Sequence, residues 1–344
     1  MNPQPGIGIA AVAAWYPEGV STAEDALADG LLGPDELAKL GTRRLPVAEI
    51  PPPDAAVEAG RLALAGAGLD AAELGLVLHA WIYHQGHDFW SPPHYLAHRL
   101  GADRAFPLGI QQMCNGGPAA VQTAVAWLTA DPGLGHALVT TADSFCGPGF
   151  DRWRGDYGVA YGDAATALLL HAGQREDDVL HLLAVAGAAA PELESVHRGD
   201  DPFSPAPRWH GPTVDVRRPK KAFLAAHGPD RLFDATRECV DRAVRTALDR
   251  AGLTPDDPQL RHVMLPRLGK QALDAGYRPA VAFLAGAEVH DLGPGTGHLG
   301  AGDTAANLAD LVDRRLLAPG ELAVAVSGGA GFTWSAAVVR APRN

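Results

Sequence analysis

The chain has 344 residues, too many for one small hydrophobic core, and this length suits two domains or one large layered domain. Hydrophobic residues make up 47% and charged residues 20%, as in an ordinary globular protein. The net charge of −12 argues against nucleic acid as a main partner, because nucleic-acid binding depends on a basic surface.

The cysteine content and the length of the apolar runs indicate where in the cell the protein is expected to be. The cysteines are Cys114, Cys146 and Cys239, and so sparse and odd a set is typical of a reducing cytoplasm. We expect Cys146 and Cys239 to be structural. No signal peptide is evident, and no apolar run reaches the roughly 18 to 20 residues of a membrane span. The sequence therefore predicts a soluble, cytoplasmic protein with no membrane partner.

The first third of the chain alternates helices with apolar strands. A strand is predicted at residues 7–14, helical structure at residues 21–40, and a helix from Asp54 to residue 67 with Asp54 as its N-terminal cap. The compact apolar run 74–80 predicts a buried strand. The order of helix, short turn and buried strand is typical of an α/β protein.

Residues 81–98 form a polar and aromatic stretch that contains four histidines. A helix beginning at Pro93 would place His94 and His98 one turn apart on one face. Zinc ligands need a convergent geometry that this spacing does not specify, so we predict no metal site. A substrate-facing rim or a subunit contact is the preferred interpretation. The residues assigned to the pocket are His84, His87 and Trp90.

Cys114 lies between an apolar run and an alanine-rich segment, residues 119–130, whose apolar periodicity predicts a helix. A cysteine at the start of a helix faces the positive end of the helix dipole, which favours the thiolate. The following Gly116 and Gly117 allow backbone or substrate to approach closely. Cys114 is therefore a candidate nucleophile, and a small buried core cysteine is the alternative.

The same alternation continues to the end of the chain. Strands are predicted at residues 136–142, 165–170, 262–265, 322–327 and 332–339, and helices at residues 222–251, 268–276 and 303–317. Residues 180–190 continue the apolar character of the strand before them. The helix at 222–251 has a candidate break at Gly228-Pro229. The repeated order suggests an internally duplicated α/β fold, with halves at residues 1–175 and 176–344.

A second candidate centre lies in the glycine-rich stretch from Gly297 to Thr304. A histidine in a tight glycine loop, here His298, can point into a cleft, and a nearby aspartate can fix its tautomer. Asp303 stands where a helix cap is expected. Together with Cys114, these residues form a candidate nucleophile, base and orienting acid; an ordinary capped turn is the alternative.

Three stretches resemble the ketosynthase III-like branch of the thiolase superfamily, and the resemblance covers nearly the whole chain. They are Cys114-Asn115-Gly116-Gly117, Tyr161-Gly162-Asp163-Ala164-Ala165, and the ending from Ser327 to Ala336. The resemblance implies a five-layered αβαβα fold, a homodimer and an acyl group carried on Cys114. It also implies an oxyanion hole made by the backbone N–H groups of Cys114 and Ala330.

Two departures from that family bear on the reaction. Condensing members carry a histidine in Pro-His-Gln-Ala-Asn and an asparagine in Gly-Asn-Thr. The corresponding places here read Leu265-Pro266-Arg267 and Gly297-His298-Leu299. The pair of donors that holds a developing enolate is lost in its usual form. A base with an acidic partner, His298 and Asp303, is gained, which suits deprotonating an alcohol or amine.

This pattern resembles acyltransferases of bacterial secondary metabolism, including polyketide and antibiotic pathways. We expect an acyl group to pass from a carrier protein or coenzyme A thioester, through Cys114, to a small-molecule hydroxyl (often on a sugar), an amine or a second carrier. No bound cofactor is expected beyond the donor's phosphopantetheine. His197 is a further candidate active-site residue. The candidate docking residues for the donor are Arg217, Arg218, Lys220 and Lys221, with a solvated helix start as the alternative.

Three other functions remain open, of which a histidine-rich metalloenzyme is the most remote. In the first, the protein is a priming β-ketoacyl synthase III that makes a carbon–carbon bond with His298 and His197 in place of the usual pair. In the second, it is a catalytically silent partner subunit. Retention of Cys114 together with an aspartate-supported histidine argues against the silent subunit.

Overall fold

The computed structural model describes residues 6–343, which form two five-stranded mixed sheets, a small two-stranded antiparallel sheet and the helices around them. The strands are β1 (Ile7–Trp15), β2 (Gly19–Thr22), β3 (Arg44–Val47), β4 (Leu74–Ala80), β5 (Phe106–Ile110), β6 (His136–Asp143), β7 (Ala164–Ala172), β8 (Leu180–Ala189), β9 (Leu260–Met264), β10 (Glu288–His290), β11 (Leu322–Gly329) and β12 (Thr333–Arg340).

The α-helices are α1 (Ala23–Ala28), α2 (Pro34–Leu40), α3 (Pro52–Ala67), α4 (Pro92–Leu100), α5 (Gly116–Ala130), α6 (Ser195–Arg198), α7 (Arg217–His227), α8 (Asp230–Ala251), α9 (Lys270–Ala272), α10 (Arg278–Val281) and α11 (Asp303–Asp313). Shorter turns are the 3₁₀ segments η1 (Ala71–Glu73), η2 (Met113–Asn115), η3 (Pro132–Leu134), η4 (Pro191–Leu193), η6 (Gly293–Gly295) and η7 (Gly300–Gly302), and the π-helical η5 (Leu273–Tyr277).

The two sheets repeat one topology. The N-terminal sheet has the order β1-β7-β6-β4-β5, and the C-terminal sheet, taken from its own first strand, has the order β8-β12-β11-β9-β10. In each sheet the first two pairings are antiparallel and the last two are parallel. The duplication inferred from the sequence is therefore confirmed. The division at residues 175 and 176 stays a prediction, consistent with β7 ending at Ala172 and β8 beginning at Leu180.

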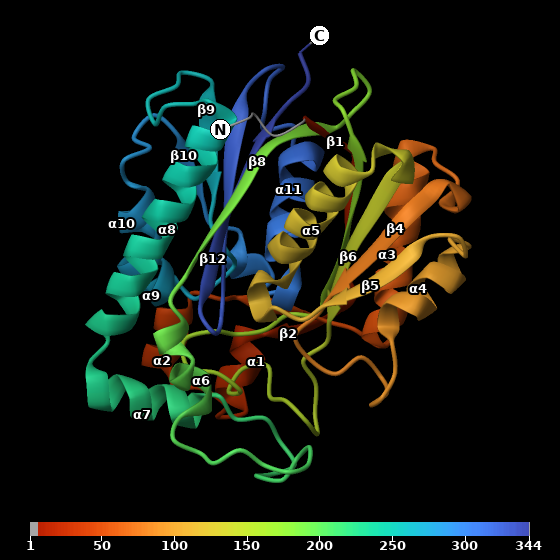
Figure 1. Ribbon diagram of the computed structural model, residues 1–344. Helices are drawn as coiled ribbons and strands as arrows, with labels where there is room; N and C mark the ends of the chain where they lie inside the picture. The colour runs from red at the N-terminus through yellow and green to blue at the C-terminus, as the bar shows by residue number, and fades with distance from the viewer. Residues whose placement is uncertain (1–5, 344) are drawn as a thin grey trace.

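The elements stack in five layers, as the family resemblance implies. In Figure 1, α3 and α4 cover the outer face of the N-terminal sheet, α5 and α11 lie between the sheets, and α8 and α10 cover the outer face of the C-terminal sheet. Helices α5 and α11 occupy equivalent places in the two halves. Each follows the edge strand of its sheet: α5 follows β5 through a short loop and the turn η2, and α11 follows β10 through a longer loop that holds η6 and η7. Cys114 and His298 lie in these two equivalent connections.

The central strands are apolar because they are covered on both faces. All residues of β6 and β11 are buried, which explains why these runs could be identified from the sequence without alternation. The helix break at Gly228-Pro229 is also confirmed, since α7 ends at His227 and α8 begins at Asp230. No helix of the described residues is long and apolar enough to cross a membrane.

Three local expectations are corrected. Residues 21–40 hold two short helices, since Gly30 adopts a φ of 66° and Pro34 starts α2. Asp54 does not cap α3, which begins at Pro52; its carboxylate accepts a 2.5 Å hydrogen bond from the hydroxyl of Tyr95. Asp303 is the first residue of α11 and not its cap, because its carboxylate is used within the site described below.

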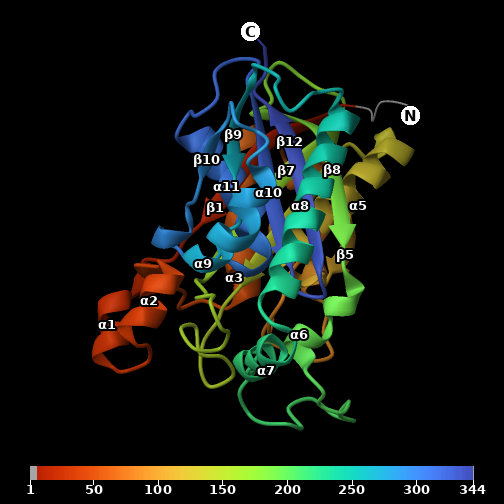
Figure 2. The same ribbon diagram turned by 90° about the vertical axis from the view of Figure 1, so that its left-hand side faces the viewer.

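Loops and short helices gather at one end of the sheets. Figure 2 shows α1, α2, α6 and α7 at this lower end, beside the loop that follows β6. The loop that follows β6, residues 144–160, lies there and has no regular helix or strand. These segments surround the carboxyl ends of the parallel strands, which is where α/β proteins bind ligands.

Candidate functional site

Cys114 lies at the start of α5, within the turn η2, and its side chain is half-buried. The preceding Met113 has a φ of 49°, an unusual value for a residue other than glycine. The turn places Cys114 on the wall of a cavity that His298 also lines. The sequence-based position of this cysteine at a loop-to-helix junction is thus confirmed.

His298 and Asp303 form a buried pair. The His298 ring nitrogen Nδ1 lies 2.7 Å from an Asp303 carboxylate oxygen, and each residue is 1% exposed. The other Asp303 oxygen accepts a 2.9 Å hydrogen bond from the Leu299 N–H. Because a carboxylate only accepts, Nδ1 carries the proton, and Nε2 is the ring nitrogen left free. Nε2 is buried and has no hydrogen-bond partner among residues 6–343.

The charge environment favours a protonated His298 in the free protein. Burial alone disfavours the imidazolium, but Asp303 and Cys114 outweigh it and raise the pKa of His298 well above its ordinary value. Burial likewise opposes the charge of Asp303, and His298 overcomes it, so the pKa of Asp303 is lowered. The two residues therefore form an ion pair, and Cys114 contributes to holding the proton on the histidine.

Glycines allow the two halves to meet at the site. A Cβ on Gly117 would lie 2.5 Å from the Ala301 carbonyl oxygen, so the start of α5 could not contact η7 with a larger residue there. Gly297 has a φ of 64°, and a Cβ on it would lie 2.2 Å from the Leu45 side chain. The close approach expected at Gly117 is confirmed, and the approaching backbone is that of the His298 segment.

The glycine-rich ending reaches the same point. A Cβ on Gly329 would lie 2.4 Å from the Asn115 nitrogen and 3.1 Å from the Cys114 nitrogen. Gly328, Gly329 and Ala330 line the cavity with Cys114. The structure therefore brings together the residues to which the sequence assigns the oxyanion hole.

Arg267 stands where condensing relatives are expected to have histidine, but its side chain does not line the cavity. It is 2% exposed, and its guanidinium donates to Asn307, Thr296 and Asp310. Its backbone N–H donates to Asp303 at 2.7 Å. The backbone of Arg267 thus helps to hold Asp303 in place, and its side chain contributes no polar group to the cavity wall.

Asp143 ties a second loop to the His298 segment. One carboxylate oxygen accepts the N–H groups of Ile82 and Tyr83, both at 2.9 Å, and the other accepts the N–H of Ala301 at 3.1 Å. Burial raises the pKa of Asp143 to about 7, against these three donors and the nearby His298, which favour the carboxylate. Asp143 thereby fixes the backbone two residues before Asp303.

The cavity has a volume of about 340 Å³ and two kinds of wall. The apolar wall comes from α7, α8 and the segment around α9, and consists mainly of Leu224, Leu232, Phe233, Leu268 and Ala272. The polar wall comes from the loop after β6, α6 and α7, and consists of Asp156, Tyr161, His197 and Lys220. Such a site can hold an apolar chain on one side and a hydrogen-bonding group on the other.

The polar wall is centred on Asp156, which is 2% exposed. Its carboxylate accepts from the Lys220 ammonium at 2.9 Å and from the Tyr161 hydroxyl at 3.1 Å. Burial opposes its charge, but Lys220 and His197 lower the pKa of Asp156. The Tyr161 ring also lies edge-on to the His298 ring, with centroids 5.3 Å apart, which links the polar wall to the histidine pair.

His197 lies in the cavity wall, as the sequence suggested for an active-site residue. Burial lowers its pKa to about 4, despite the nearby Asp156, so the ring is neutral near pH 7. Its Nε2 is buried without a hydrogen-bond partner in the described residues, and its ring packs edge-on against Phe332 at 5.5 Å. A neutral histidine with a free ring nitrogen in a cavity can bind a substrate hydroxyl or carbonyl.

The predicted rim of His84, His87 and Trp90 is corrected. None of the three belongs to the wall of the Cys114 cavity in the part of the chain that the structure describes. Instead, His84 lies 3.9 Å from Asp88, and the rings of His87 and Trp90 pack edge-on at 5.7 Å on the loop before α4. The sequence pattern could not reveal this, because loop direction depends on tertiary contacts.

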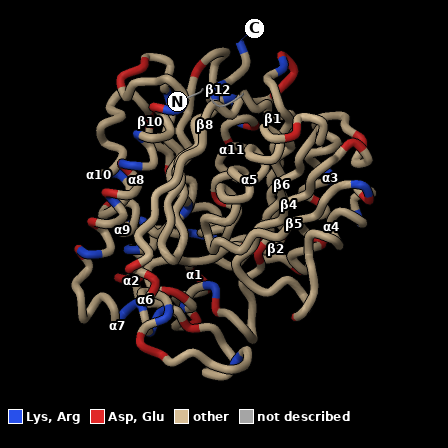
Figure 3. The backbone as a smooth tube through the Cα atoms, in the orientation of Figure 1, with Lys and Arg blue, Asp and Glu red and all other residues tan. Residues whose placement is uncertain are grey.

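The predicted docking cluster is largely neutralised within the chain. Arg217 pairs with Glu36 at 2.6 Å, Arg218 pairs with Asp201, and Lys220 is in the polar wall. The Lys221 ammonium lies over the Tyr157 ring, 5.1 Å from its centroid. Figure 3 shows the corresponding mixture of blue and red backbone around α6 and α7. A docking role for these residues stays a prediction.

Sequence reasoning missed Arg267, Asp143 and Asp156 as parts of the site. All three are charged residues that flank predicted strands or lie in the loop after β6, and a charged residue there is usually solvated. Position 267 drew notice only because condensing members of the family carry a histidine there. Asp163, in the Tyr161-Gly162-Asp163 motif, is structural: it pairs with Arg152 at 3.1 Å and accepts the Phe145 N–H.

Comparison with known proteins agrees with this architecture. The family described as 3-oxoacyl-[acyl-carrier-protein (ACP)] synthase III matches residues 108–188, and its C-terminal part matches residues 248–341. The beta-ketoacyl-[acyl-carrier-protein] synthase III of Roseiflexus castenholzii is 26% identical over 292 residues, covering 83% of this chain and 82% of its own. The Mycobacterium tuberculosis H37Rv enzyme is 25% identical over 346 residues, covering 98% and 96%.

Solved structures give the same relationship. ChlB3, named as an acyltransferase, is 31% identical, with a TM-score of 0.87, and the match covers 98% of both chains. The 3-oxoacyl-(acyl carrier protein) synthase III of Pseudomonas aeruginosa PAO1 shares the fold at a TM-score of 0.76 and 22% identity, over 98% of this chain and 99% of its own. The chain belongs to the ketosynthase III-like branch of the thiolase superfamily.

Proposed function

We propose that the protein is an acyltransferase that carries an acyl group on Cys114 and hands it to a hydroxyl, an amine or a second carrier. One observation carries this proposal: the cavity beside Cys114 contains a histidine held by a buried aspartate, while Arg267, at the place of the second condensing histidine, turns its side chain away. The similarity to ChlB3, named as an acyltransferase, supports the same function.

The first half-reaction loads Cys114. With the proton already held on His298, the Cys114 sulfur attacks the thioester carbonyl of the donor. The carbonyl oxygen becomes an oxyanion that the N–H groups of Cys114 and Ala330 stabilise. The tetrahedral intermediate collapses with cleavage of the donor C–S bond. The departing phosphopantetheine thiolate takes the proton from His298, which leaves acyl-Cys114 and a neutral histidine.

The second half-reaction uses the same histidine as a base. Once Cys114 is a neutral thioester, its contribution to the raised pKa of His298 is gone, so the histidine binds a proton less tightly. His298 can then remove the proton of an acceptor hydroxyl or amine as its oxygen or nitrogen attacks the acyl carbon. The Cys114 thiolate leaves, and His298 keeps the acceptor's proton, which restores the state of the free protein. Asp303 stabilises the imidazolium throughout.

The polar wall fits the acceptor, and the apolar wall fits the acyl chain. A group bearing a hydroxyl would find Asp156, Lys220 and His197 on one side of the cavity. The donor reaches Cys114 as a thioester; the names of the relatives specify an acyl carrier protein, and coenzyme A is the other donor that we propose. The acyl group, the acceptor and a place in polyketide or antibiotic biosynthesis stay predictions.

A priming ketosynthase is the second candidate, and His197 favours it. A neutral His197 with a free Nε2 could replace the missing donor to a malonyl-derived enolate. The acylated state weighs against this, because His298 then holds a proton less tightly and can act as a base, whereas an enolate holder must keep its donor. Release of carbon dioxide separates the two functions, as described in the Discussion.

We predict that His197→Phe slows only the second half-reaction. The phenyl ring keeps the packing against Phe332 but removes Nε2, so one hydrogen bond to the acceptor is lost. Transfer from acyl-Cys114 to the acceptor should fall about tenfold, whereas loading of Cys114 should change less than about twofold. Rapid quenching followed by intact-mass spectrometry measures both steps. Equal losses in both steps would contradict this role, and His197→Gln is the matched control that restores a donor.

The homodimer implied by the family has a candidate surface on this chain. β5 is the edge strand of the N-terminal sheet, and its first residue, Phe106, is 53% exposed and stacks on Trp127 at 5.3 Å. An exposed, apolar edge strand is a ready template for pairing with another chain. We expect light scattering to give twice the chain mass, and Phe106→Lys to shift the mass towards that of one chain. A monomeric wild-type protein would contradict the proposal.

A further inference from the structure

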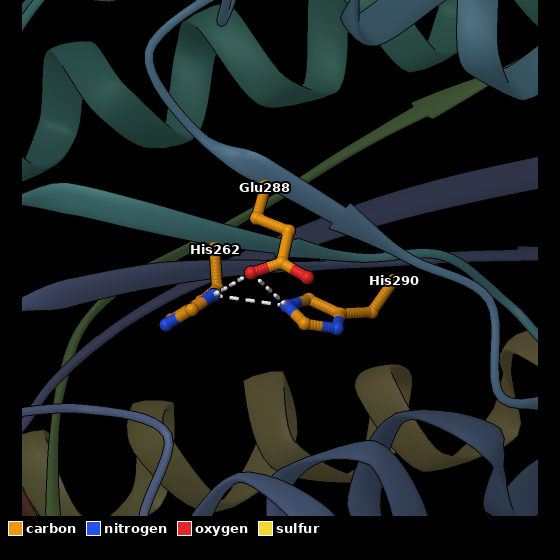
Figure 4. Close-up of side chains that lie close together, drawn as sticks. All are labelled: His262, Glu288 and His290. Atoms are coloured by element: carbon orange, nitrogen blue, oxygen red, sulfur yellow. Dashed lines mark hydrogen bonds and ion pairs between the residues drawn. The ribbon is translucent and has the colours of Figure 1, made fainter.

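A second group of polar side chains lies outside the Cys114 cavity, at the edge of the C-terminal sheet. His262 on β9 and Glu288 on β10 lie opposite each other in the parallel pairing, and His290 is two residues further on the same face of β10. Their three ligand atoms lie within 4.8 Å of one another. Figure 4 shows the side chains converging from the two strands.

The distances within this cluster are close to those of a metal site. His262 Nδ1 lies 2.9 Å from His290 Nε2, and a Glu288 oxygen lies 3.9 Å from the former and 3.8 Å from the latter. Ligands at zinc bond lengths of about 2.0–2.2 Å in a tetrahedron lie about 3.3–3.5 Å apart. Each separation therefore differs from a zinc site by about half an ångström, which side-chain rotation can supply.

The tautomer of His262 is already suited to a metal. Its Nε2 lies 2.9 Å from the Leu316 carbonyl oxygen, which can only accept, so Nε2 carries the proton and Nδ1 presents a lone pair to the cluster. Metal-binding histidines usually donate their second N–H to a carbonyl or carboxylate in this way. In the absence of metal, His290 Nε2 donates to His262 Nδ1. Metal binding would move that proton to His290 Nδ1.

We propose that His262, Glu288 and His290 form a binding site for a divalent transition metal of the zinc type, with the fourth position open to water. The side chains of His262 and His290 are 12% and 15% exposed, so an ion can reach them, and Glu288 is 70% exposed and free to adjust. Two imidazoles and one carboxylate are a donor set that zinc accepts. This proposal is independent of the acyl-transfer function.

The position of the site gives it a structural role. His290 ends β10 immediately before the loop that carries His298, and Leu316, which holds His262, follows α11, the helix that begins with Asp303. A bound ion would therefore fasten both ends of the segment that contains the histidine and aspartate pair. None of its three ligands lines the Cys114 cavity in the described chain, so the ion would not touch the reacting atoms.

Titration of the full chain with zinc chloride tests the site. The protein is first freed of metal with a chelator, and a Cys114→Ala/Cys146→Ala background removes the thiols that would compete for zinc. We expect one zinc ion per chain by calorimetry. His290→Asn and Glu288→Gln should each weaken binding more than about tenfold, whereas His98→Gln, which changes an exposed histidine elsewhere, should leave it unchanged.

Stability and hydrogen exchange provide a second test that does not depend on activity. Zinc at about a hundredfold excess over Kd should raise Tm by about 3–4 °C for a chain of this size and slow amide exchange in residues 288–317. Glu288→Gln, whose side chain is exposed, should reduce both effects to about half or less at the same zinc concentration. Absence of saturable binding, or equal binding by the parent and His290→Asn, would overturn the proposal.

Discussion

We expect Cys114→Ala to abolish the acyl-enzyme and to lower acyl transfer at least about 10⁴-fold, because in the part of the chain that the structure describes Cys114 is the only cysteine on the cavity wall. The substitution removes only the sulfur atom, so the fold should persist. Intact-mass spectrometry after incubation with an acyl thioester gives the occupancy of Cys114 directly, and a coupled thiol-release assay gives the rate.

Cys146→Ala is the matched control for the loss of Cys114, because Cys146 is an exposed thiol outside the wall of the Cys114 cavity. This variant should load and transfer as the wild type does. If the wild-type protein formed no adduct on Cys114 with acyl-coenzyme A or with an acyl carrier protein, the silent-subunit interpretation would be favoured. An adduct that persists in Cys114→Ala would show that another residue carries the acyl group.

Asp303→Asn should lower acyl transfer about 10³–10⁴-fold while leaving the fold intact. The amide can no longer require a proton on His298 Nδ1, so the ring can adopt the tautomer that turns an N–H toward Cys114, and the imidazolium loses its partner. Single-turnover loading and transfer rates measure the effect. Asp313→Asn, at an exposed position on the same helix, is the control and should be unchanged.

The same substitution has a pH signature. Asp303 is the main group that raises the pKa of His298 against the effect of burial, so the pKa should fall in Asp303→Asn. The imidazolium would then be lost at a lower pH, and the alkaline limit of Cys114 loading should move in the acidic direction. In the wild type, the stability contributed by this protonated histidine is present at low pH and is lost as pH rises through its raised pKa. An unchanged alkaline limit would contradict the pairing.

Much of the fold could be predicted because buried strands appear in the sequence as short, continuous apolar runs. The apolar runs that form β4 and β6 are bounded by turns, and Gly228-Pro229 breaks a helix for reasons local to the backbone. The pairing of His298 with Asp303 was also accessible, since only four residues separate them in the sequence. Patterns local in the sequence were therefore enough to predict the architecture and the pair of His298 and Asp303.

The rest depends on contacts between distant segments. Lys220 was assigned to a surface cluster because a run of basic residues is normally solvated, yet Asp156 draws it into the cavity wall. His262, Glu288 and His290 come together only through the register of two parallel strands, which no sequence pattern reveals. The same holds for Arg267, whose buried bonds join three segments of the C-terminal half.

The central claim is that acyl-Cys114 reacts with an oxygen or nitrogen nucleophile and not with a malonyl-derived carbanion. The most direct test is to isolate the acyl-enzyme and divide it between malonyl-carrier protein and a panel of hexoses, amines and holo-carrier protein. We predict that malonyl-carrier leaves the adduct on Cys114 intact with no release of carbon dioxide, while a member of the panel removes it as an ester, amide or thioester. Release of carbon dioxide with a β-ketoacyl product would contradict the account.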